Sequence, residues 1–219
     1  EVLKAIARIK AERREVDDAH SLHKERLRIF KSLGDRREIA GVMGEIARIK
    51  LEKGAVAAAL SLHEERLQIF ESLEDRRAGA MTMGEIARIK VDRGEVEAAL
   101  SLHKAELDIY ESLGDRRSRA VTLGDIARIK MDRGAVEEAL SLHKERLQVF
   151  ESLDDQWSRA VALGDIARIK VDQGEVAEGL SLHEAELEVY EAMGDRWSRA
   201  VTLGDIARIK MARGEVEAS

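Results

Sequence analysis

The sequence contains no cysteine and no proline, and aromatic residues make up only 3% of its 219 positions. Without cysteine the chain forms no disulfide and carries no thiolate chemistry, although the redox compartment stays open. Without proline, no helix interior is interrupted by one. We find no run of about eighteen apolar residues and no signal peptide, so we expect a cytoplasmic protein without a membrane partner.

Charged residues are abundant, at 37% of the chain, and the net charge is −6. Both signs are interspersed along the sequence, whereas a nucleic-acid-binding protein usually has a clustered basic face. We therefore expect no nucleic-acid partner. Leucine, isoleucine and alanine recur at helical spacing between the charges, which predicts long amphipathic helices.

The stretch Ile-Ala-Arg-Ile-Lys recurs every forty residues, at 6–10, 46–50, 86–90, 126–130, 166–170 and 206–210. A repeat of this length predicts a stacked array in which each unit buries its apolar face against its neighbours. We expect a single solenoid over 1–219. Its repeats are about 1–33, 34–73, 74–113, 114–153, 154–193 and 194–219. The first and last are incomplete, and the chain begins at Glu1 rather than Met, so we expect a piece of a longer protein.

The repeat at 114–153 illustrates the two helices that we expect in each unit. Asp115 is suited to cap the first helix, the A helix, which runs to about Arg133. Gly134 ends it, as glycine does where the backbone turns left-handed. The second helix, the B helix, runs from about Val136 to Leu153. Linkers of about two to four residues force neighbouring helices to pack antiparallel.

Two repeats depart from the pattern at the end of the B helix. Gly114 and Gly194 end the preceding B helices, but Glu74 and Asp154 stand at the equivalent positions. We expect these two turns to be slightly strained or differently shaped.

The helical wheel gives the two helices different faces. The A helix is apolar on two flanks, so it is sandwiched between neighbours, and a narrow strip of it stays exposed. The B helix has one apolar stripe. That stripe consists of Val136, Ala139, Leu140, His143, Leu147 and Phe150. The A helices therefore line one surface of the array, and the B helices form the other.

These features resemble the tetratricopeptide repeat (TPR) family over the whole chain. The resemblance is carried by Leu123-x-x-Ile126-Ala127, Gly134, Ala139 and His143, and by the closing Leu153-x-Asp155. The forty-residue length is similar to the long TPR variant of spindle-orientation and G-protein-regulator scaffolds and of kinesin light chains. Lys130 and Arg146 depart from the tyrosine and alanine usual in the family. The resemblance implies a right-handed superhelix whose concave, A-helix surface binds extended peptides or partner helices.

The resemblance places an arginine ladder on the concave surface. The ladder consists of Arg8, Arg48, Arg88, Arg128, Arg168 and Arg208. Guanidinium groups bind carboxylates through two parallel hydrogen bonds, so the ladder could clamp an acidic partner segment. Internal neutralisation is the alternative, because Arg128 lies near Asp125 and Asp132 on its own helix. The acids that follow the ladder arginines by four residues include Asp92, Asp132 and Asp172.

Two further ladders need a structural explanation. Glycines at 44, 84, 124, 164 and 204 sit in the middle of the A helices, at a cost of about 1 kcal/mol each. Either a close neighbour or a ligand backbone could offset that cost.

Histidines at 23, 63, 103, 143 and 183 lie in the apolar stripe of the B helix, too far apart to share a metal ion. We expect them to be buried and neutral, hydrogen-bonded to the next helix, with pKa values below about 6.5.

We predict a non-catalytic protein-interaction scaffold that binds a protein or peptide on its A-helix surface, with an acidic segment as the candidate ligand. The apolar floor of that surface is predicted at Met81, Val121, Val161 and Val201. Trp157 and Trp197 are candidates for partner contacts at the repeat edge, or they cover the preceding B helix. No catalytic constellation, metal cluster or nucleotide loop is recognisable, so we expect no enzymatic activity, metal or cofactor.

The alternative role is structural self-assembly into a homo-oligomer through uncapped ends. The last repeat lacks most of its B helix, so its A helix is expected to expose an apolar flank that includes Leu203 and Ile206.

Overall fold

The computed structural model describes residues 16–214, which contain ten α-helices and no strand. The chain divides into two compact units, Glu1–Leu113 and Gly114–Ser219, and the boundary coincides with a predicted repeat boundary. The first unit contains α2 (Val16–Leu33), α3 (Arg36–Glu52), α4 (Val56–Ser72), α5 (Arg76–Asp92) and α6 (Val96–Ser112). The second contains α7 (Arg116–Asp132), α8 (Val136–Ser152), α9 (Gln156–Asp172), α10 (Val176–Met193) and α11 (Arg196–Ala212).

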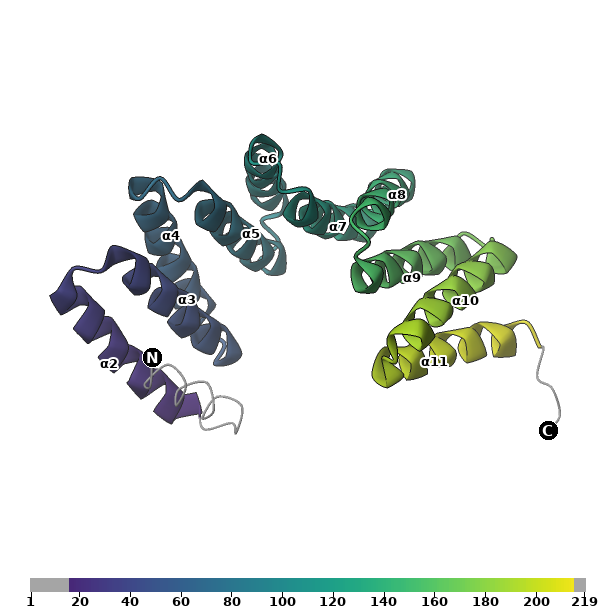
Figure 1. The fold of residues 1–219 in the computed structure, drawn as a ribbon, viewed down its shortest axis with the longest axis horizontal. Helices are drawn as coiled ribbons and strands as arrows, with labels where there is room; N and C mark the ends of the chain where they lie inside the picture. Colours follow the sequence, from purple (N-terminus) through teal and green to yellow (C-terminus); the bar gives the residue numbers. More distant parts are fainter. Residues whose placement is uncertain (1–15, 215–219) are drawn as a thin grey trace. The chain divides into compact units, whose positions relative to one another are not determined.

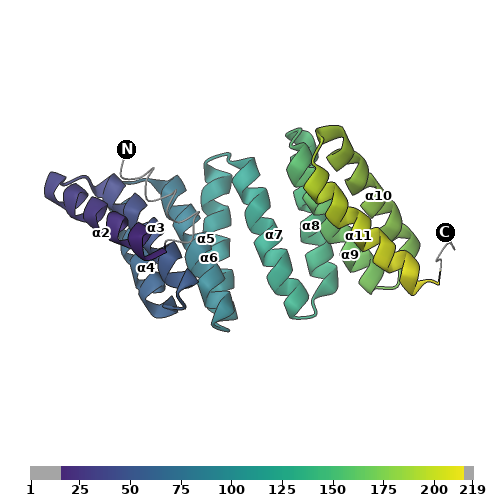
Figure 2. The same cartoon turned by 90° about the horizontal axis from the view of Figure 1, so that it is seen from below.

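Each full repeat is an A helix followed by an antiparallel B helix, as the sequence predicts (Figure 1). The A helices are α3, α5, α7, α9 and α11, and the B helices are α2, α4, α6, α8 and α10. Within each unit a B helix packs against the A helix of its own repeat and against the A helix that follows, for example α8 against α7 and α9. Figure 2 shows the same hairpins from a second direction. The all-α solenoid architecture is therefore confirmed. No helix in the described part is long and apolar enough to span a membrane.

An aspartate caps every A helix. The Asp115 carboxylate accepts a hydrogen bond from the backbone N–H of Ser118, which confirms the predicted cap. Such a cap contributes about 1 kcal/mol. The same carboxylates also join successive repeats, because Arg117 Nε of α7 donates to Asp155 at 2.8 Å, and Arg37 of α3 donates to Asp75 at 2.5 Å.

The turns after the B helices all take the left-handed conformation. The φ angles are 65° at Gly114 and 69° at Gly194. Glu74 and Asp154 have φ angles of 54° and 53°, so they adopt the glycine conformation despite their side chains. Of the two expected alternatives, strain or a different shape, the different shape is not observed at these positions. The expected strain remains a prediction, since a non-glycine residue pays a steric cost in this region.

The core lies between the flanks of the A helices and the stripes of the B helices. Ala120, Leu123 and Ala127 are buried on one flank of α7, and Ile129 is buried on the other. The aromatic residue near the end of each complete B stripe in the second unit, such as Phe150, is buried as well. Both helical faces therefore match the predicted amphipathic pattern.

The five ladder histidines are all buried, as expected, with at most 6% of each residue exposed. Loss of solvation lowers the pKa of His23, and the adjacent Arg26 lowers it further. Loss of solvation also lowers the pKa of His143, although the Asp165 charge partly opposes that effect. The predicted hydrogen bond to the next helix was wrong for His23, His103 and His183, whose Nδ1 atoms contact a residue one turn along the same helix.

The strain at the two left-handed turns predicts a gain in stability from glycine. We expect Glu74→Gly to raise the free energy of unfolding by about 1 kcal/mol, because glycine adopts positive φ without a steric penalty. Asp154→Gly should gain less, because aspartate tolerates this region better than glutamate. Chemical denaturation measures both changes. Glu71→Gly, within helix α4, is the matched control and should destabilise the protein by about 1 kcal/mol; a loss of stability in Glu74→Gly contradicts the prediction.

The lowered pKa of His143 predicts a dependence of stability on pH. Below about pH 6.5 the unfolded chain binds a proton that the folded chain resists, so the free energy of unfolding falls as the pH drops toward the folded-state pKa. The charged groups around the ring are Arg146, Asp165 and Arg168. Denaturation at pH 7.5 and 5.5 should show a smaller pH dependence for His143→Gln than for the parent. An equal dependence in both proteins would show that His143 does not contribute.

Candidate functional site

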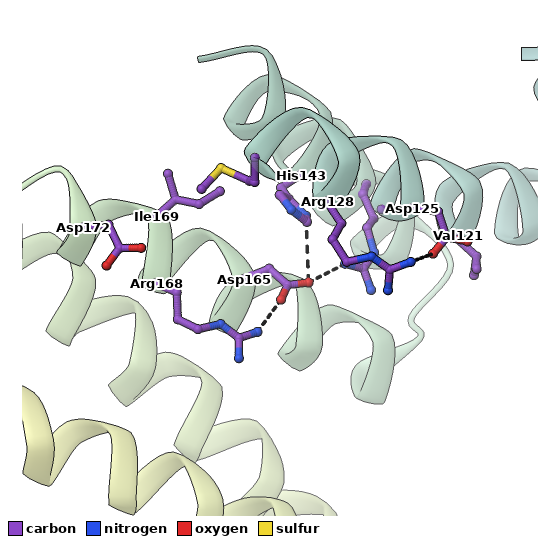
Figure 3. Close-up of a pocket in the computed structure, with 11 residues that line it drawn as sticks. Val121, Asp125, Arg128, His143, Asp165, Arg168, Ile169 and Asp172 are labelled. Atoms are coloured by element: carbon purple, nitrogen blue, oxygen red, sulfur yellow. Dashed lines mark hydrogen bonds and ion pairs between the residues drawn. The ribbon is translucent and has the colours of Figure 1, made fainter. Parts of the chain in front are cut away.

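A pocket of about 380 Å³ opens between α7, α8 and α9 of the second unit (Figure 3). We name it the α7–α9 pocket. Helix α7 contributes Val121, Gly124, Asp125, Arg128 and Met131, helix α8 contributes His143 and Arg146, and helix α9 contributes Asp165, Arg168, Ile169 and Asp172. Two A helices therefore form its walls, and a B helix forms its floor.

The first unit contains an equivalent pocket of about 310 Å³ between α3, α4 and α5, the α3–α5 pocket. Ten of its lining residues lie eighty positions before residues of the α7–α9 pocket. They are Gly44, Glu45, Arg48, Leu51, His63, Arg66, Glu85, Arg88, Ile89 and Asp92. Gly41 takes the place of Val121. The pocket is thus a product of the repeat and not of one local irregularity.

Asp165 lies at the centre of the α7–α9 pocket, between cations from two helices. Its carboxylate accepts a hydrogen bond from Arg146 Nη1 of α8 at 2.7 Å and pairs with Arg168 on its own helix. Figure 3 shows His143 directed toward the same carboxylate, with Nδ1 3.8 Å from Oδ2. The Asp165 carboxylate therefore already occupies one position in which the arginines of the pocket could bind an acidic group of a partner.

The first unit repeats this arrangement around Glu85. Arg66 Nη1 lies 2.5 Å from the Glu85 carboxylate, and His63 Nδ1 lies 3.0 Å from it. Burial opposes ionisation of Glu85, but the nearby His63 ring and the Arg66 charge keep the pKa of this carboxyl below its usual value. The Glu85 carboxylate is therefore held in its charged form by the B helix beneath it.

Four ladder arginines, Arg48, Arg128, Arg168 and Arg208, pair with the acid three residues before them. Arg128 lies 3.5 Å from Asp125, Arg48 lies 3.3 Å from Glu45, and Arg208 pairs with Asp205. These pairs support the neutralisation alternative. The guanidinium groups nevertheless remain open to solvent, with 61% of the Arg168 side chain exposed, so each keeps donors that can reach a ligand. The downstream acids Asp92, Asp132 and Asp172 are also exposed.

Only some of the residues predicted to form the apolar floor line a pocket. Val121 lines the α7–α9 pocket and is exposed. Met81 and Val201 are exposed but line none of the three pockets described in this section, and Val161 is half-buried. The main apolar contributions to the two equivalent pockets come instead from Leu51 and Met131, and from isoleucines of the following A helix.

The mid-helix glycines make room for a charged side chain of the B helix. A Cβ atom at Gly124 would lie 3.2 Å from the Arg146 guanidinium, and one at Gly164 would lie 2.7 Å from Glu186 Oε1. Gly44 and Gly84 meet Arg66 and Glu106 in the same way. Of the two explanations that the sequence left open, a close neighbour therefore accounts for these four glycines. A larger residue at these positions would displace the charged group.

The charged residue packed on the glycine was missed by the sequence analysis as a functional candidate. It lies three positions after each ladder histidine and is arginine at 26, 66 and 146 but glutamate at 106 and 186. The signal was present in the sequence, because the glycine, the histidine and this charge recur together every forty residues. Only the packing shows that the three positions form one contact.

A third pocket, of about 340 Å³, lies between α9, α10 and α11 and is named the α9–α11 pocket. Its polar lining residues are Arg168, Asp172, His183, Asp205 and Arg208. It shares Arg168 and Asp172 with the α7–α9 pocket, so the two adjoin along α9. Arg168 and Arg208, two of the ladder arginines that the structure describes, therefore line pockets. The other described ladder arginines, Arg48, Arg88 and Arg128, line pockets as well.

The predicted edge and end residues are only partly exposed. Trp157 and Trp197 are 50% and 77% exposed, and they stand where Arg117 and Arg37 bind the cap of the next repeat. Leu203 is 41% exposed, as expected for self-association. Ile206 is 8% exposed, so its assignment to an exposed flank was wrong, because its side chain faces the core side of α11.

No group of His, Cys, Asp or Glu within the described residues could hold a metal ion. Lys130 and its equivalent Lys170, which stand where TPR proteins usually have tyrosine, join the two helices of a repeat. Lys170 at the end of α9 contacts Glu175 at 2.8 Å and Glu178 at 3.1 Å, and these bonds raise the pKa of Lys170. Lys130 contacts Glu138 at 2.6 Å in the preceding repeat.

Comparison with known proteins relates the fold to solved structures. No protein-family model matches the sequence, and no curated protein matches it either. A putative kinesin light chain from Podosopora anserina with nearly identical TPR-like repeats superposes with a TM-score of 0.69 at 22% identity, over 89% of this chain and 96% of that one. Aspartyl phosphate phosphatase F from Bacillus subtilis gives a TM-score of 0.82 at 18% identity, over 93% of this chain and 52% of that one.

A third similar structure is the Rap conjugation gene regulator of the plasmid pLS20 in complex with the Phr* peptide. Its TM-score is 0.71 at 14% identity, over 90% of this chain and 54% of that one. At such low identities the likeness concerns the fold alone. The helix pairs, their forty-residue period and these superpositions agree with one another. The chain therefore has the fold of the TPR-like repeat proteins, an α-solenoid of antiparallel helix pairs.

Proposed function

We propose that this chain is a non-catalytic scaffold that binds a peptide or a partner segment on its A-helix surface. The observation that carries the proposal is the recurrence of one arginine-lined pocket in both units, with equivalent residues eighty positions apart. A scaffold that binds an extended chain needs such repeated, similar subsites along one surface. A pocket of this size accommodates one or a few side chains of a peptide.

The chemistry of the α7–α9 pocket favours a partner with acidic groups. Arg128 and Arg168 stand on opposite walls of the α7–α9 pocket and expose more than half of each side chain. Each guanidinium has five N–H donors, and the internal acids use only some of them. A carboxylate entering between the two walls would gain charge-assisted hydrogen bonds from both, which are stronger than neutral ones.

The structural neighbours support a binding role. One is a regulator solved in complex with a peptide, and another carries kinesin light chain repeats. The phosphatase name belongs to a protein of which this chain covers only about half, at 18% identity. Within residues 16–214 the buried histidines contact charged partners and no serine or threonine nucleophile, so the described pockets favour binding over catalysis.

Charge reversal on the pocket walls tests the proposal. We expect Arg128→Glu with Arg168→Glu to weaken binding of a fluorescent nine-residue peptide rich in aspartate and glutamate by at least about tenfold, or 1.4 kcal/mol. The same peptide with asparagine and glutamine should bind more weakly to the parent. Fluorescence anisotropy measures both, and the parent affinity should fall with added salt.

The matched control is Lys104→Glu with Lys144→Glu, which changes the net charge equally on the outer face of the B helices. It should leave most of the affinity in place. Equal losses in the two double variants would show a non-specific charge effect. Binding by the arginine variant at the parent level, with helix content unchanged by circular dichroism, would refute the clamp.

A second candidate function is self-association through α11. Ala200, Leu203 and Ala207 of α11 are exposed, whereas their equivalents Ala160, Leu163 and Ala167 are buried in the preceding repeat. Apolar surface of this kind favours association.

We expect light scattering to show a mass that rises with concentration, and Leu203→Glu to abolish the rise because it places a charge in the contact. Leu153→Glu, at an exposed turn, is the control and should leave the mass unchanged. A monomer across the whole concentration series rules out this candidate.

A further inference from the structure

The residue three positions after each ladder histidine carries opposite charges in different repeats, although four of these residues pack on equivalent mid-helix glycines. In α8 it is Arg146, packed on Gly124, and in α10 it is Glu186, packed on Gly164. Both B helices belong to the second unit. Arg146 itself lines the α7–α9 pocket, whereas α10 contributes His183, the hydrogen-bond partner of Glu186, to the α9–α11 pocket. The B helices of the two adjoining pockets therefore differ by two units of charge at one equivalent position.

Each charge comes with its own aromatic partner one turn later. The three arginines precede phenylalanine, and the two glutamates precede tyrosine. The Arg146 guanidinium lies over the Phe150 ring, 5.5 Å from its centre, within the range of a cation–π contact. In α10 the tyrosine, Tyr190, is buried below Glu186. The chain thus contains two combinations of side chains at equivalent positions of the B helix, arginine with phenylalanine and glutamate with tyrosine. Each combination is compatible with the same helix packing.

In α10 and α2 the charged residue also determines which nitrogen of the histidine carries a proton. A carboxylate only accepts hydrogen bonds, so His183 Nδ1, 2.8 Å from Glu186 Oε2, is the donor. In the neutral ring, Nε2 is then an acceptor, and it has no hydrogen-bond partner among the described residues. An arginine only donates, so His23 Nδ1, 3.1 Å from Arg26 Nη1, is the acceptor.

The acid of the following A helix is neutralised differently in the two pockets. Arg146 extends across to Asp165 of α9. The Asp165 carboxylate therefore has two guanidinium partners, Arg146 and Arg168. Glu186 cannot pair with the equivalent Asp205, and its carboxylate turns to His183 instead. The α7–α9 pocket therefore has an additional cation at its floor, and the α9–α11 pocket has an additional carboxylate beneath its histidine.

We propose that the residue three positions after the ladder histidine selects the charge of the side chain that each pocket accepts. The α7–α9 pocket, lined by Arg146, takes an acidic side chain, and the α9–α11 pocket, whose His183 is hydrogen-bonded to Glu186, takes a basic one. His143 and His183, both more than nine-tenths buried, line the two pockets and keep a ring nitrogen without a hydrogen bond in the described part of the chain. The inference rests on the proposed function of this surface in peptide binding.

The opposite charges of Arg146 and Glu186 make each pocket complementary to a side chain of the opposite sign. Like charges brought together in a partly buried site repel each other, so each pocket excludes one sign as well as attracting the other. Two adjoining pockets of opposite preference would fix the direction of a bound peptide that carries one acidic and one basic residue. A uniform row of arginines would not distinguish the two directions.

The chain itself supplies variants that should keep the fold. Arg146→Glu with Phe150→Tyr converts α8 to the α10 set, and Glu186→Arg with Tyr190→Phe converts α10 to the α8 set. Gly124 and Gly164 leave space for either side chain, because the equivalent glycines 44 and 84 accommodate arginine and glutamate. Circular dichroism and thermal unfolding check that each variant is folded.

The experiment follows the ring signals of His143 and His183 by NMR in the whole chain, assigned with His143→Gln and His183→Gln. The probes are two capped pentapeptides at matched ionic strength, Ac-Ala-Ala-Asp-Ala-Ala-NH₂ and Ac-Ala-Ala-Arg-Ala-Ala-NH₂. We expect His143 to respond to the aspartate probe at a concentration about tenfold lower than to the arginine probe, and His183 to show the reverse. Each swapped variant should exchange the preference of its own pocket and leave the other unchanged.

Two measurements keep the inference falsifiable. The ring ¹⁵N shifts report the tautomer without any probe, and they should place the proton of neutral His183 on Nδ1 in the parent. A parent tautomer on Nε2, or folded swapped variants that keep the parent preference, overturns the inference but leaves peptide binding intact. No response of either histidine to either probe overturns the proposed function of these pockets as well.

Discussion

The contact between a charged side chain of the B helix and a glycine in the middle of the A helix determines how charge is arranged in this protein. A helix-interior glycine costs about 1 kcal/mol relative to alanine. The absence of a Cβ atom at Gly124 and Gly164 lets a guanidinium or a carboxylate lie against the A-helix backbone. That position brings the charge beside the histidine and within reach of the next A helix. The pockets of both units depend on this placement.

The helices, their order and most of their ends could be predicted from the sequence, because a forty-residue period repeats the same local signals. Asp115 and Gly134 illustrate this, since capping and left-handed turns depend on nearby atoms alone. The shape of the turns at Glu74 and Asp154 could not be predicted in the same way. There the packing of the flanking helices imposes a backbone conformation that the side chains disfavour.

The candidate site was less predictable than the fold. The ladder arginines and their acids follow from helical spacing, but the contact of Arg146 with Asp165 joins residues on different helices, nineteen positions apart. Ile206 shows the same limit, because its burial depends on which flank of α11 faces the preceding helix. Periodicity identifies the two apolar flanks of an A helix. It does not show how much of each flank a neighbouring helix covers.

The two interchangeable side-chain sets of the B helix have a consequence for the evolution of the array. The helix caps, the left-handed turns and the apolar flanks are the same in both kinds of repeat, so gain, loss or exchange of a forty-residue unit preserves the stacking surfaces. Such an event would nevertheless change the order of arginine and glutamate along the pockets. A gene with nearly identical repeats could in this way acquire a new pattern of charges in one step, without passing through an unstable intermediate.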